Sequence, residues 1–213
     1  MKSIWIFFLI FLFSDGVNAW SRLEKQVIFG SLPEVERALN QGVNINATEK
    51  DGDGETLFMY SLKRNRPLPV IQKMVENGAN LRAVDKENKT VLMYATAGNS
   101  VQVIGYLIEQ GVSVDSVDKN GRNALMEACV ENSSPEVIER LIQAGLPVNE
   151  TDKKKKTALM LAAKETINAE IIDILLLKGA DIEMKDERGF SAFHYFKKNK
   201  ALKDETIAQK LSF

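Results

Sequence analysis

Hydrophobic positions along most of this chain recur in blocks of nearly equal length. Each block contains a short phrase in which one small polar residue precedes a mostly apolar run, and successive phrases start 34, 33, 34 and 34 residues apart. The phrases begin at Thr56, Thr90, Asn123, Thr157 and Ser191. A second apolar run keeps a similar interval and ends at a glycine, a residue that stops helices readily because it adopts the left-handed conformation. These glycines are Gly42, Gly78, Gly111, Gly145 and Gly179.

The spacing of apolar residues within the runs predicts two short helices in each block. In the second run of one block, Val103, Ile104, Leu107 and Ile108 fall on one face of a helix. A fixed period in this range is typical of one helical hairpin per repeat, stacked into a solenoid. Such units bury their apolar faces only on one another, so we predict an all-α protein with one continuous core and an exposed groove along it.

The residues around each turn resemble those of the ankyrin-repeat family. Three turns carry a glycine three residues after the opening aspartate, whereas Asn88 and Lys155 occupy that place in the other two. The proline of the family motif is absent, and its histidine remains only at His194, with methionine at the same place in the other repeats. The opening aspartates are Asp51, Asp85, Asp118, Asp152 and Asp186.

The resemblance implies an all-α ankyrin-repeat solenoid of helix-turn-helix units with hairpin-like turns. It implies about four full repeats, at residues 51–84, 85–117, 118–151 and 152–185, between terminal caps at 20–50 and 186–213. Together these form a single ankyrin-repeat domain at 20–213.

The first nineteen residues differ in character from the repeats. Lys2 precedes an apolar run from Ile4 to Phe13, and a small-residue motif follows at Val17-Asn18-Ala19. A charged start, an apolar segment of this length and such a motif predict a secretory signal peptide, residues 1–19, that is cleaved after Ala19. The alternative is an uncleaved anchor, although the run is shorter than a bilayer-spanning helix. We therefore expect a periplasmic or secreted protein, without stable membrane insertion after cleavage.

Charge and candidate chemistry narrow the functional classes. The formal net charge is −1, so no global field favours nucleic acid. The only cysteine, Cys129, sits in an apolar phrase and is expected to be buried rather than nucleophilic. The only histidine, His194, lies two repeats further on, which places the two side chains about 20 Å apart if packed helices lie about 10 Å apart. We predict no catalytic residues, no metal site, no cofactor and no enzymatic activity.

The run Lys153-Lys154-Lys155-Lys156 is the densest charge feature of the chain. One interpretation is a solvated loop, since four like charges repel one another. The other is a basic finger that meets an acidic surface on a partner protein. The sequence leaves both interpretations open.

The ankyrin resemblance also implies where a partner binds, namely at the turn tips and on the exposed side of the first helices. Tyr60, Tyr94 and Tyr195 share one repeat position, where they form either a discontinuous aromatic contact stripe or a layer half-buried between helices, as Leu161 at the same position indicates. The predicted partner-binding residues are Glu55, Tyr60, Lys63, Arg64, Lys86, Glu87, Lys89, Tyr94, Lys119, Asn120, Arg122, Glu131, Lys153, Lys154, Lys156, Lys164, Phe190 and Tyr195.

These features predict a non-enzymatic protein-binding scaffold, exported to the cell envelope and monomeric when unbound. The chain resembles exported, periplasmic bacterial ankyrin-repeat proteins that act in immunity or self-protection, which implies that it sequesters or inhibits an exported enzyme such as a cell-wall peptidase. One alternative is a periplasmic oxidative-stress factor acting beside a catalase. Another is a secreted, host-directed ankyrin effector.

Overall fold

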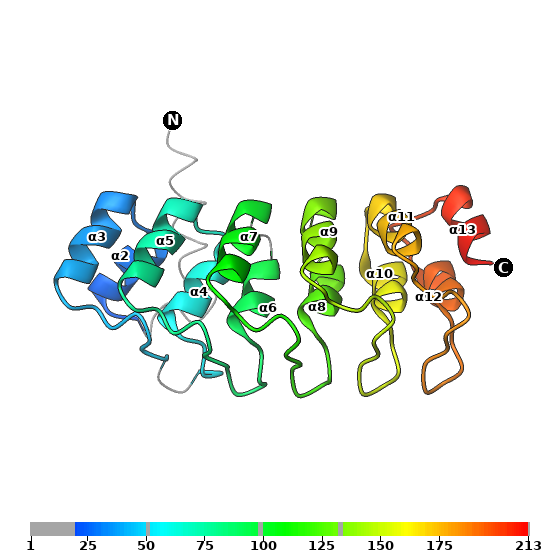
Figure 1. Ribbon diagram of the computed structural model, residues 1–213, viewed down its shortest axis with the longest axis horizontal. Helices are drawn as coiled ribbons and strands as arrows, with labels where there is room; N and C mark the ends of the chain where they lie inside the picture. The colour runs from blue at the N-terminus through cyan, green and yellow to red at the C-terminus, as the bar shows by residue number, and fades with distance from the viewer. Residues whose placement is uncertain (1–19, 50–51, 98–99, 132–133, 213) are drawn as a thin grey trace.

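The computed structural model describes residues 20–49, 52–97, 100–131 and 134–212. Over these residues the chain forms short helices joined by turns (Figure 1). The helices are α2 Arg22–Phe29, α3 Leu32–Asn40, α4 Leu57–Lys63, α5 Leu68–Glu76, α6 Val91–Thr96, α7 Val101–Glu109, α8 Ala124–Val130, α9 Pro135–Gln143, α10 Ala158–Glu165, α11 Ala169–Leu177, α12 Ala192–Lys198 and α13 Glu205–Leu211. The predicted signal peptide lies outside the described residues.

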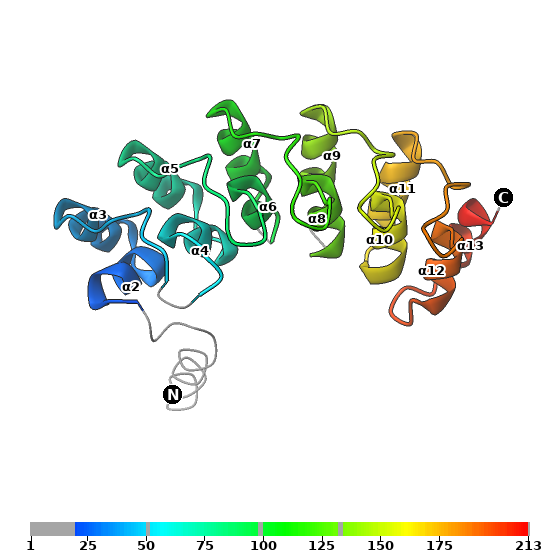
Figure 2. The same cartoon turned by 90° about the horizontal axis from the view of Figure 1, so that it is seen from below.

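The helices stack in two rows that together form an arc. In Figure 2, α4, α6, α8, α10 and α12 form the inner, concave row, and α5, α7, α9 and α11 form the outer row. Figure 1 shows that the turns leading into the inner helices project from the stack on one side. The predicted all-α solenoid is therefore confirmed. We call the inner row with its turns the concave face, and each projecting turn a finger.

The polar residue of each repeated phrase starts an inner helix. Thr56, Thr90, Asn123 and Thr157 are the N-cap residues of α4, α6, α8 and α10. Each side-chain oxygen accepts a hydrogen bond from the backbone N–H three residues later, at 2.9 to 3.4 Å. This bond satisfies one of the amide groups that a helix start leaves unpaired, so the phrase fixes where each inner helix begins.

The apolar residues of the phrases form a core that runs through the whole stack. Phe58, Leu92, Leu125 and Leu159 occupy the same repeat position, and all four are completely buried. Inner helices contact their neighbours on both sides, α4 with α6, α6 with α8, α8 with α10 and α10 with α12. Each repeat therefore completes the core of the next, as a solenoid requires.

Side-chain amides link the repeats near both ends of the array. Asn46 donates from Nδ2 to the carbonyl of Gly78 at 2.9 Å, and its Oδ1 accepts from the N–H of Asn80 at 2.8 Å. Asn149 makes the same pair of bonds with the next repeat, to the carbonyl of Gly179 and from the N–H of Asp181. The two equivalent positions between them carry Arg82 and Asp115. These middle junctions therefore depend on other contacts.

Candidate protein-binding surface

Each described finger is a tight turn closed by its own aspartate. In the finger that precedes α6, Oδ1 of Asp85 accepts hydrogen bonds from the N–H groups of Glu87 at 2.7 Å and Lys89 at 2.8 Å. The N–H of Asp85 in turn donates to the carbonyl of Lys89 at 3.1 Å. Asp118, Asp152 and Asp186 make the same three bonds in the following fingers. The last residue of each finger is thus clamped through both its N–H and its carbonyl.

The fourth residue of each finger adopts a left-handed backbone conformation. The φ angles are +85° at Gly54, +60° at Asn88, +78° at Gly121, +58° at Lys155 and +78° at Gly189. Asparagine tolerates this conformation better than other side chains, whereas lysine does so at a cost. The turn chemistry therefore persists at the two positions where the sequence departs from the family motif.

Backbone hydrogen bonds join successive fingers into a row. The N–H groups of Lys86, Lys119 and Lys153 each donate to a carbonyl of the preceding finger at 2.8 Å, and Glu187 does so at 3.1 Å. The acceptors are the carbonyls of Asp53, Glu87, Asn120 and Lys154. Because each finger is fixed both internally and to its neighbour, the charged side chains on the row stand at a set spacing.

The last residue of each finger lies directly before an inner-helix N-cap and contacts the inner helices. In chain order this position carries Glu55, Lys89, Arg122, Lys156 and Phe190, all of them half-buried. Glu55 pairs with Lys63 of α4 at 3.0 Å, and Nζ of Lys156 lies 5.0 Å from the ring centre of Tyr195 on α12. We call this set the finger-base row. All five members were among the predicted binding residues.

Glu127 of α8 organises the cations at the middle of the row. Its side chain is 4% exposed, and its carboxylate accepts a hydrogen bond from Lys89 Nζ at 2.8 Å and one from Arg122 Nη1 at 3.4 Å. Nε of Arg122 also lies 3.7 Å from Oδ2 of Asp152 in the following finger. Burial of Lys89 alone would lower its pKa, but the hydrogen bond and charge of Glu127 outweigh this effect and raise the pKa of Lys89. A network of alternating charge therefore crosses three repeats.

Sequence reasoning missed Glu127 as a functional residue. The available signal was a carboxylate at a helix position that carries Tyr60, Tyr94, Leu161 and Tyr195 in the other repeats. Acidic side chains are rarely fully buried unless they are paired. Because the other repeats carry tyrosine or leucine at this position, the carboxylate of Glu127 could have been predicted to pair with nearby cations.

The three tyrosines at that position are buried, which corrects the interpretation of an exposed aromatic stripe. Tyr60, Tyr94 and Tyr195 are 5%, 8% and 8% exposed. The hydroxyls of Tyr94 and Tyr195 donate to Oδ2 of Asp85 and Asp186, at 2.7 and 2.5 Å. Tyr94 and Tyr195 thus support their own fingers from the side of the core, and burial leaves little of all three rings accessible to a partner.

The hydrogen bond between Tyr195 and Asp186 shifts the pKa values of both groups. Burial and the bond to Asp186 raise the pKa of Tyr195 to about 12. Burial alone would raise the pKa of Asp186, but the bonds from Tyr195, Phe190 and Arg188 and the charge of Lys156 outweigh it and lower that pKa. The finger therefore holds Asp186 in its ionised form.

The remaining predicted residues divide between the finger tips and the ends of the inner helices. Exposed at the tips are Lys86, Glu87, Lys119, Asn120, Lys153 and Lys154, and exposed on the inner helices or just after them are Lys63, Glu131 and Lys164. Arg64 is half-buried, with its guanidinium 5.9 Å from the ring centre of Phe29 and 5.1 Å from that of Tyr60. Glu87 pairs with Lys119 at 3.6 Å, and Lys164 pairs with Glu165.

The basic run is only partly a solvated loop. Lys153, Lys154 and Lys155 are exposed at the finger tip, as the first interpretation requires. Lys156 departs from it because its side chain folds back, half-buried, over the ring of Tyr195. The run thus supplies two kinds of charge, one free at the tip and one held at the base.

Cys129 and His194 lie on different helices, with a further helix between them. Cys129 on α8 is fully buried, and burial raises the pKa of its thiol to about 12. Helix α10 packs between α8 and α12, which carries His194. His194 stacks on Phe190 with 3.7 Å between ring centres. The prediction of a buried Cys129 is confirmed, and the two side chains are too far apart for a nucleophile–base pair.

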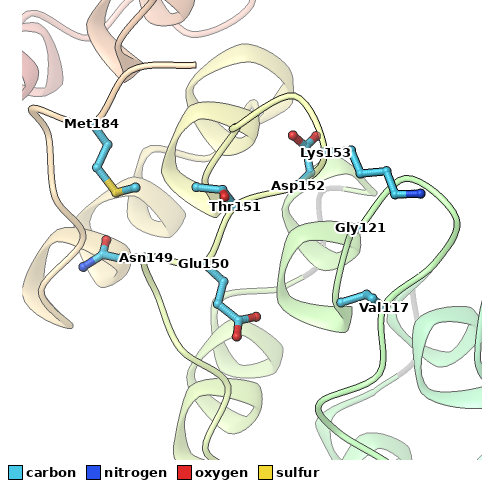
Figure 3. Close-up of a pocket in the computed structure, with 8 residues that line it drawn as sticks. All are labelled: Val117, Gly121, Asn149, Glu150, Thr151, Asp152, Lys153 and Met184. Carbon is cyan, nitrogen blue, oxygen red and sulfur yellow. The ribbon is translucent and has the colours of Figure 1, made fainter. Parts of the chain in front are cut away.

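The described parts of the chain hold no group of three or more His, Cys, Asp or Glu side chains placed to bind a metal ion. An open hollow of about 590 Å³ lies among segments of successive repeats, with Val117, Asn149, Glu150 and Met184 on its wall (Figure 3). Glu150 is already engaged there, since it accepts a hydrogen bond from Asn123 Nδ2 at 3.0 Å. A second hollow, of about 350 Å³, occupies the preceding repeat junction. Such recurring spaces follow from stacking and differ from a dedicated ligand site, which converges several polar groups.

Within the ranges that the structure describes, none of the helices has the length and apolar character needed to cross a membrane.

A curved stack of helical hairpins with a preorganised row of charged fingers defines a repeat scaffold of the kind that binds other proteins. The family profile described as ankyrin repeats (three copies) matches residues 25–118 and 106–186. The match covers well over half of the sequence, and the chain belongs to the ankyrin-repeat family. Proteins of this family are typically non-enzymatic scaffolds, and the membership indicates a protein-binding role here.

The chain is similar to one part of a curated group of relatives. It is 30% identical over 87 residues to ankyrin repeat and SOCS box protein 6 from Pongo abelii, Mus musculus and Homo sapiens. The matched segment is 41% of this chain but only 20% or 21% of each relative. The chain therefore spans about a fifth of the length of these relatives.

Proposed function

We propose that this protein is exported to the cell envelope, where its concave face binds a second exported protein and holds it inactive. The partner class that we favour is a cell-wall hydrolase such as a peptidase, kept inactive in the cell that makes it. The role is then one of immunity or self-protection.

The observation that carries the proposal is the finger-base row on the concave face. Its three cations are clamped through the backbone, and Glu127 holds the side chains of Lys89 and Arg122 from behind, which gives a preorganised charged surface suited to a protein. Cys129 is buried on α8 and separated by α10 from His194 on α12, so these two residues form no nucleophile–base pair, which favours binding over catalysis. Export rests on the signal peptide that the sequence predicts at residues 1–19.

Affinity capture tests the binding role. The purified protein is used as bait in an envelope extract of the source cell, and a bait with Lys153 and Lys154 changed to Glu serves as the matched control. We expect the native bait to retain a wall-degrading enzyme and to reduce its activity on purified cell wall. Capture of a catalase or of a secretion component would contradict the proposed role, as would capture that leaves hydrolase activity unchanged.

Cell fractionation tests export independently of the partner. We expect the protein from the envelope fraction to begin at Trp20, because the predicted cleavage follows Ala19. Trp20 itself is 4% exposed and lies 6.0 Å from Tyr60 between ring centres, so this residue packs into the folded domain. Recovery of a chain that begins at Met1, from the cytoplasm or a membrane pellet, would contradict export with cleavage.

A further inference from the structure

We propose that the three cations Lys89, Arg122 and Lys156 bind an acidic segment of the partner in the extended polyproline II conformation, with a carboxylate at about every third residue. We call these three residues the base cations. The proposal deepens the proposed function, because it rests on the concave face being the surface that meets a protein. It specifies the chemistry of the segment that the face receives.

The base cations occupy the same place in three successive fingers, so they form a regular ladder. Each is the fifth residue of its finger, and each N–H donates to its finger's aspartate at 2.8 or 2.9 Å. The fingers are joined to one another by backbone bonds of 2.8 Å. The backbone positions of the three base cations are therefore fixed relative to one another.

The spacing of the ladder selects the conformation and period of its ligand. Packed helices lie about 8–10 Å apart, and the base cations of neighbouring repeats are offset by one such step. A polyproline II chain rises about 3.1 Å per residue and completes a turn in three residues, so side chains three residues apart lie on the same face and cover about one step. A helical segment rises only about 1.5 Å per residue and would need about six residues for the same step.

The charge of the fingers favours a carboxylate-bearing ligand. The three fingers at 85–90, 118–123 and 152–157 carry eight lysine or arginine side chains, and Glu87 is their only exposed carboxylate. Asp85, Asp118 and Asp152 are buried and accept hydrogen bonds from backbone N–H groups, so they face away from a partner. Opposite charge on the partner would both speed association and fix its register.

Arg122 at the centre of the ladder retains donor capacity for a carboxylate. A guanidinium has five N–H donors, yet Arg122 makes a single hydrogen bond, of 3.4 Å, to Glu127. Its Nε is buried and lies 3.7 Å from Oδ2 of Asp152, so a partner would meet the exposed part of the side chain, which is 28% exposed as a whole. A partner carboxylate that approaches from the groove would add charge-assisted bonds, the strongest class at such surfaces.

The carboxylate behind the ladder serves to hold the cations rather than to fill space. A tyrosine occupies the position of Glu127 in three other repeats, and two of these tyrosines bond to the aspartate of their own finger. A tyrosine at this helix position is therefore sufficient to fill the space between the helices. Glu127 instead reaches Lys89 in one repeat and Arg122 in its own, which aligns the two cations across the junction.

The ends of the row limit the length of the acidic segment. Glu55 precedes the base cations and repels a carboxylate, while Phe190 follows them and offers an aromatic ring stacked on His194. The segment that fits best thus has three spaced acidic residues over the base cations. One step beyond Lys156, an apolar residue would meet Phe190.

The experiment uses the full chain, purified from the cells that express it, and labelled synthetic peptides of about ten residues. In the first peptide, three glutamates recur at every third position among serine and glycine, and in the second the same residues are rearranged so that the glutamates are adjacent. Fluorescence anisotropy at about 0.15 M ionic strength measures binding under moderate screening. We expect the spaced peptide to bind at least about tenfold more tightly. Equal binding of the two peptides would overturn the proposal, as would tighter binding of inorganic polyphosphate, which would indicate a general polyanion site.

Single substitutions assign the binding to the ladder. We expect the affinity for the spaced peptide to fall by about five- to tenfold in each of three variants, Arg122→Gln, Lys89→Gln and Lys156→Gln. The loss should be largest for Arg122→Gln. Arg122→Lys keeps the charge but loses the bidentate geometry, so an intermediate loss is expected. Lys178→Gln, an exposed site at the end of α11 in the outer row, removes the same charge elsewhere and should change little. If Lys178→Gln weakens binding as much as the ladder variants do, with all variants melting as cooperatively as the native chain, the ladder is not the site.

These outcomes are separable from those of the proposed function. Should the envelope capture yield a hydrolase while the spaced peptide shows no preference, the binding role stands and only the acidic-segment chemistry fails. Should the peptide bind as expected and no hydrolase be captured, the ladder stands and the partner class is wrong.

Discussion

At the scale of single residues, an aspartate closes each of the four fingers that begin at Asp85, Asp118, Asp152 and Asp186. Asp186 accepts hydrogen bonds from two backbone N–H groups and from the hydroxyl of Tyr195. These bonds favour the ionised form, which is why the pKa of Asp186 is lowered despite burial. A group with a lowered folded-state pKa stabilises the protein above its unfolded pKa, and this stability is lost as the pH falls through the folded value.

Changing Tyr195 to Phe should therefore destabilise the protein in a pH-dependent way. At pH 7 the loss of a hydrogen bond to a buried carboxylate should cost about 1.5–3 kcal/mol. The difference from the native chain should shrink as the pH falls from about 4, the ordinary aspartate value, through the lower folded-state pKa of Asp186. Urea unfolding at neutral and acidic pH measures this difference. The control is Tyr106→Phe, at a half-buried tyrosine of α7, which should show no such pH dependence. If Tyr195→Phe lowers the free energy of unfolding by the same amount at neutral and acidic pH, the account is contradicted.

Lys155 provides a second test at residue scale, because it is a lysine with a φ of +58°. Lys155→Gly should raise the free energy of unfolding by about 0.5–1 kcal/mol, since relief of the left-handed strain exceeds the extra entropy of an unfolded glycine. The matched reverse change is Gly189→Ala, where a Cβ meets open space and only the backbone conformation is strained. It should destabilise by about 1 kcal/mol. Thermal or urea unfolding that showed no gain for Lys155→Gly would refute this explanation of the turn.

At the scale of the elements, the sequence predicted the helices better than it predicted the surface. The phrases at Thr56, Thr90, Asn123 and Thr157 each mark an N-cap, because capping is a local interaction within one turn of chain. The glycines after the second helices and the left-handed finger positions are local features of the same kind. Such signals are readable from a single sequence because they involve residues a few positions apart.

The candidate site was predicted less completely, because its geometry depends on contacts between repeats. Lys89 and Glu127 are 38 residues apart in the chain and meet only through stacking. The tyrosine position also stayed ambiguous in the sequence, since its burial depends on how neighbouring inner helices pack. The finger-base residues were found as members of a long set, but nothing local distinguished them from the exposed tips.

The asparagine bridges give a prediction about how neighbouring elements are joined. Asn149→Ala removes two hydrogen bonds to the next repeat and should lower the free energy of unfolding by about 1–2 kcal/mol. Asp115→Ala, at the equivalent position of the preceding repeat, breaks only a local bond with Ser113 and should cost less than about 0.5 kcal/mol. Equal costs for the two variants, measured by chemical unfolding, would mean that the amide bridge does not stabilise the junction.

At the scale of the whole molecule, stacking of the repeats gathers positive charge on one side of a chain whose net charge is small. The chain as a whole carries a formal charge of −1, yet the fingers gather lysine and arginine along one side of the concave face. Exposed charges of this kind act on association rates and are screened by salt within about 10 Å at 0.1 M. The scaffold therefore provides both steering, from the finger tips, and fixed contacts, from the finger bases.

Charge reversal at the tips should separate these two effects. Lys153→Glu with Lys154→Glu should leave the fold intact, because both side chains are exposed and the hydrogen bonds of these residues are made by their backbone groups. Association with the captured partner should slow at least about tenfold at low salt and recover most of its native rate at high salt. Surface plasmon resonance over a salt series gives the rates. An effect confined to dissociation would place these lysines in a desolvated contact instead.

The central claim is that the concave finger face meets a partner protein, and photo-crosslinking in the living cell tests it most directly. A photoreactive residue is placed singly at Lys119 or Lys154 on the finger tips and, as controls, at Gln102 of α7 or Lys178 at the end of α11 in the outer row. The account predicts that both finger positions yield an adduct of one size with the same exported protein, whereas the outer-row positions yield none. Adducts from Gln102 and Lys178 alone would contradict the account, because they would place the binding surface on the outer helices.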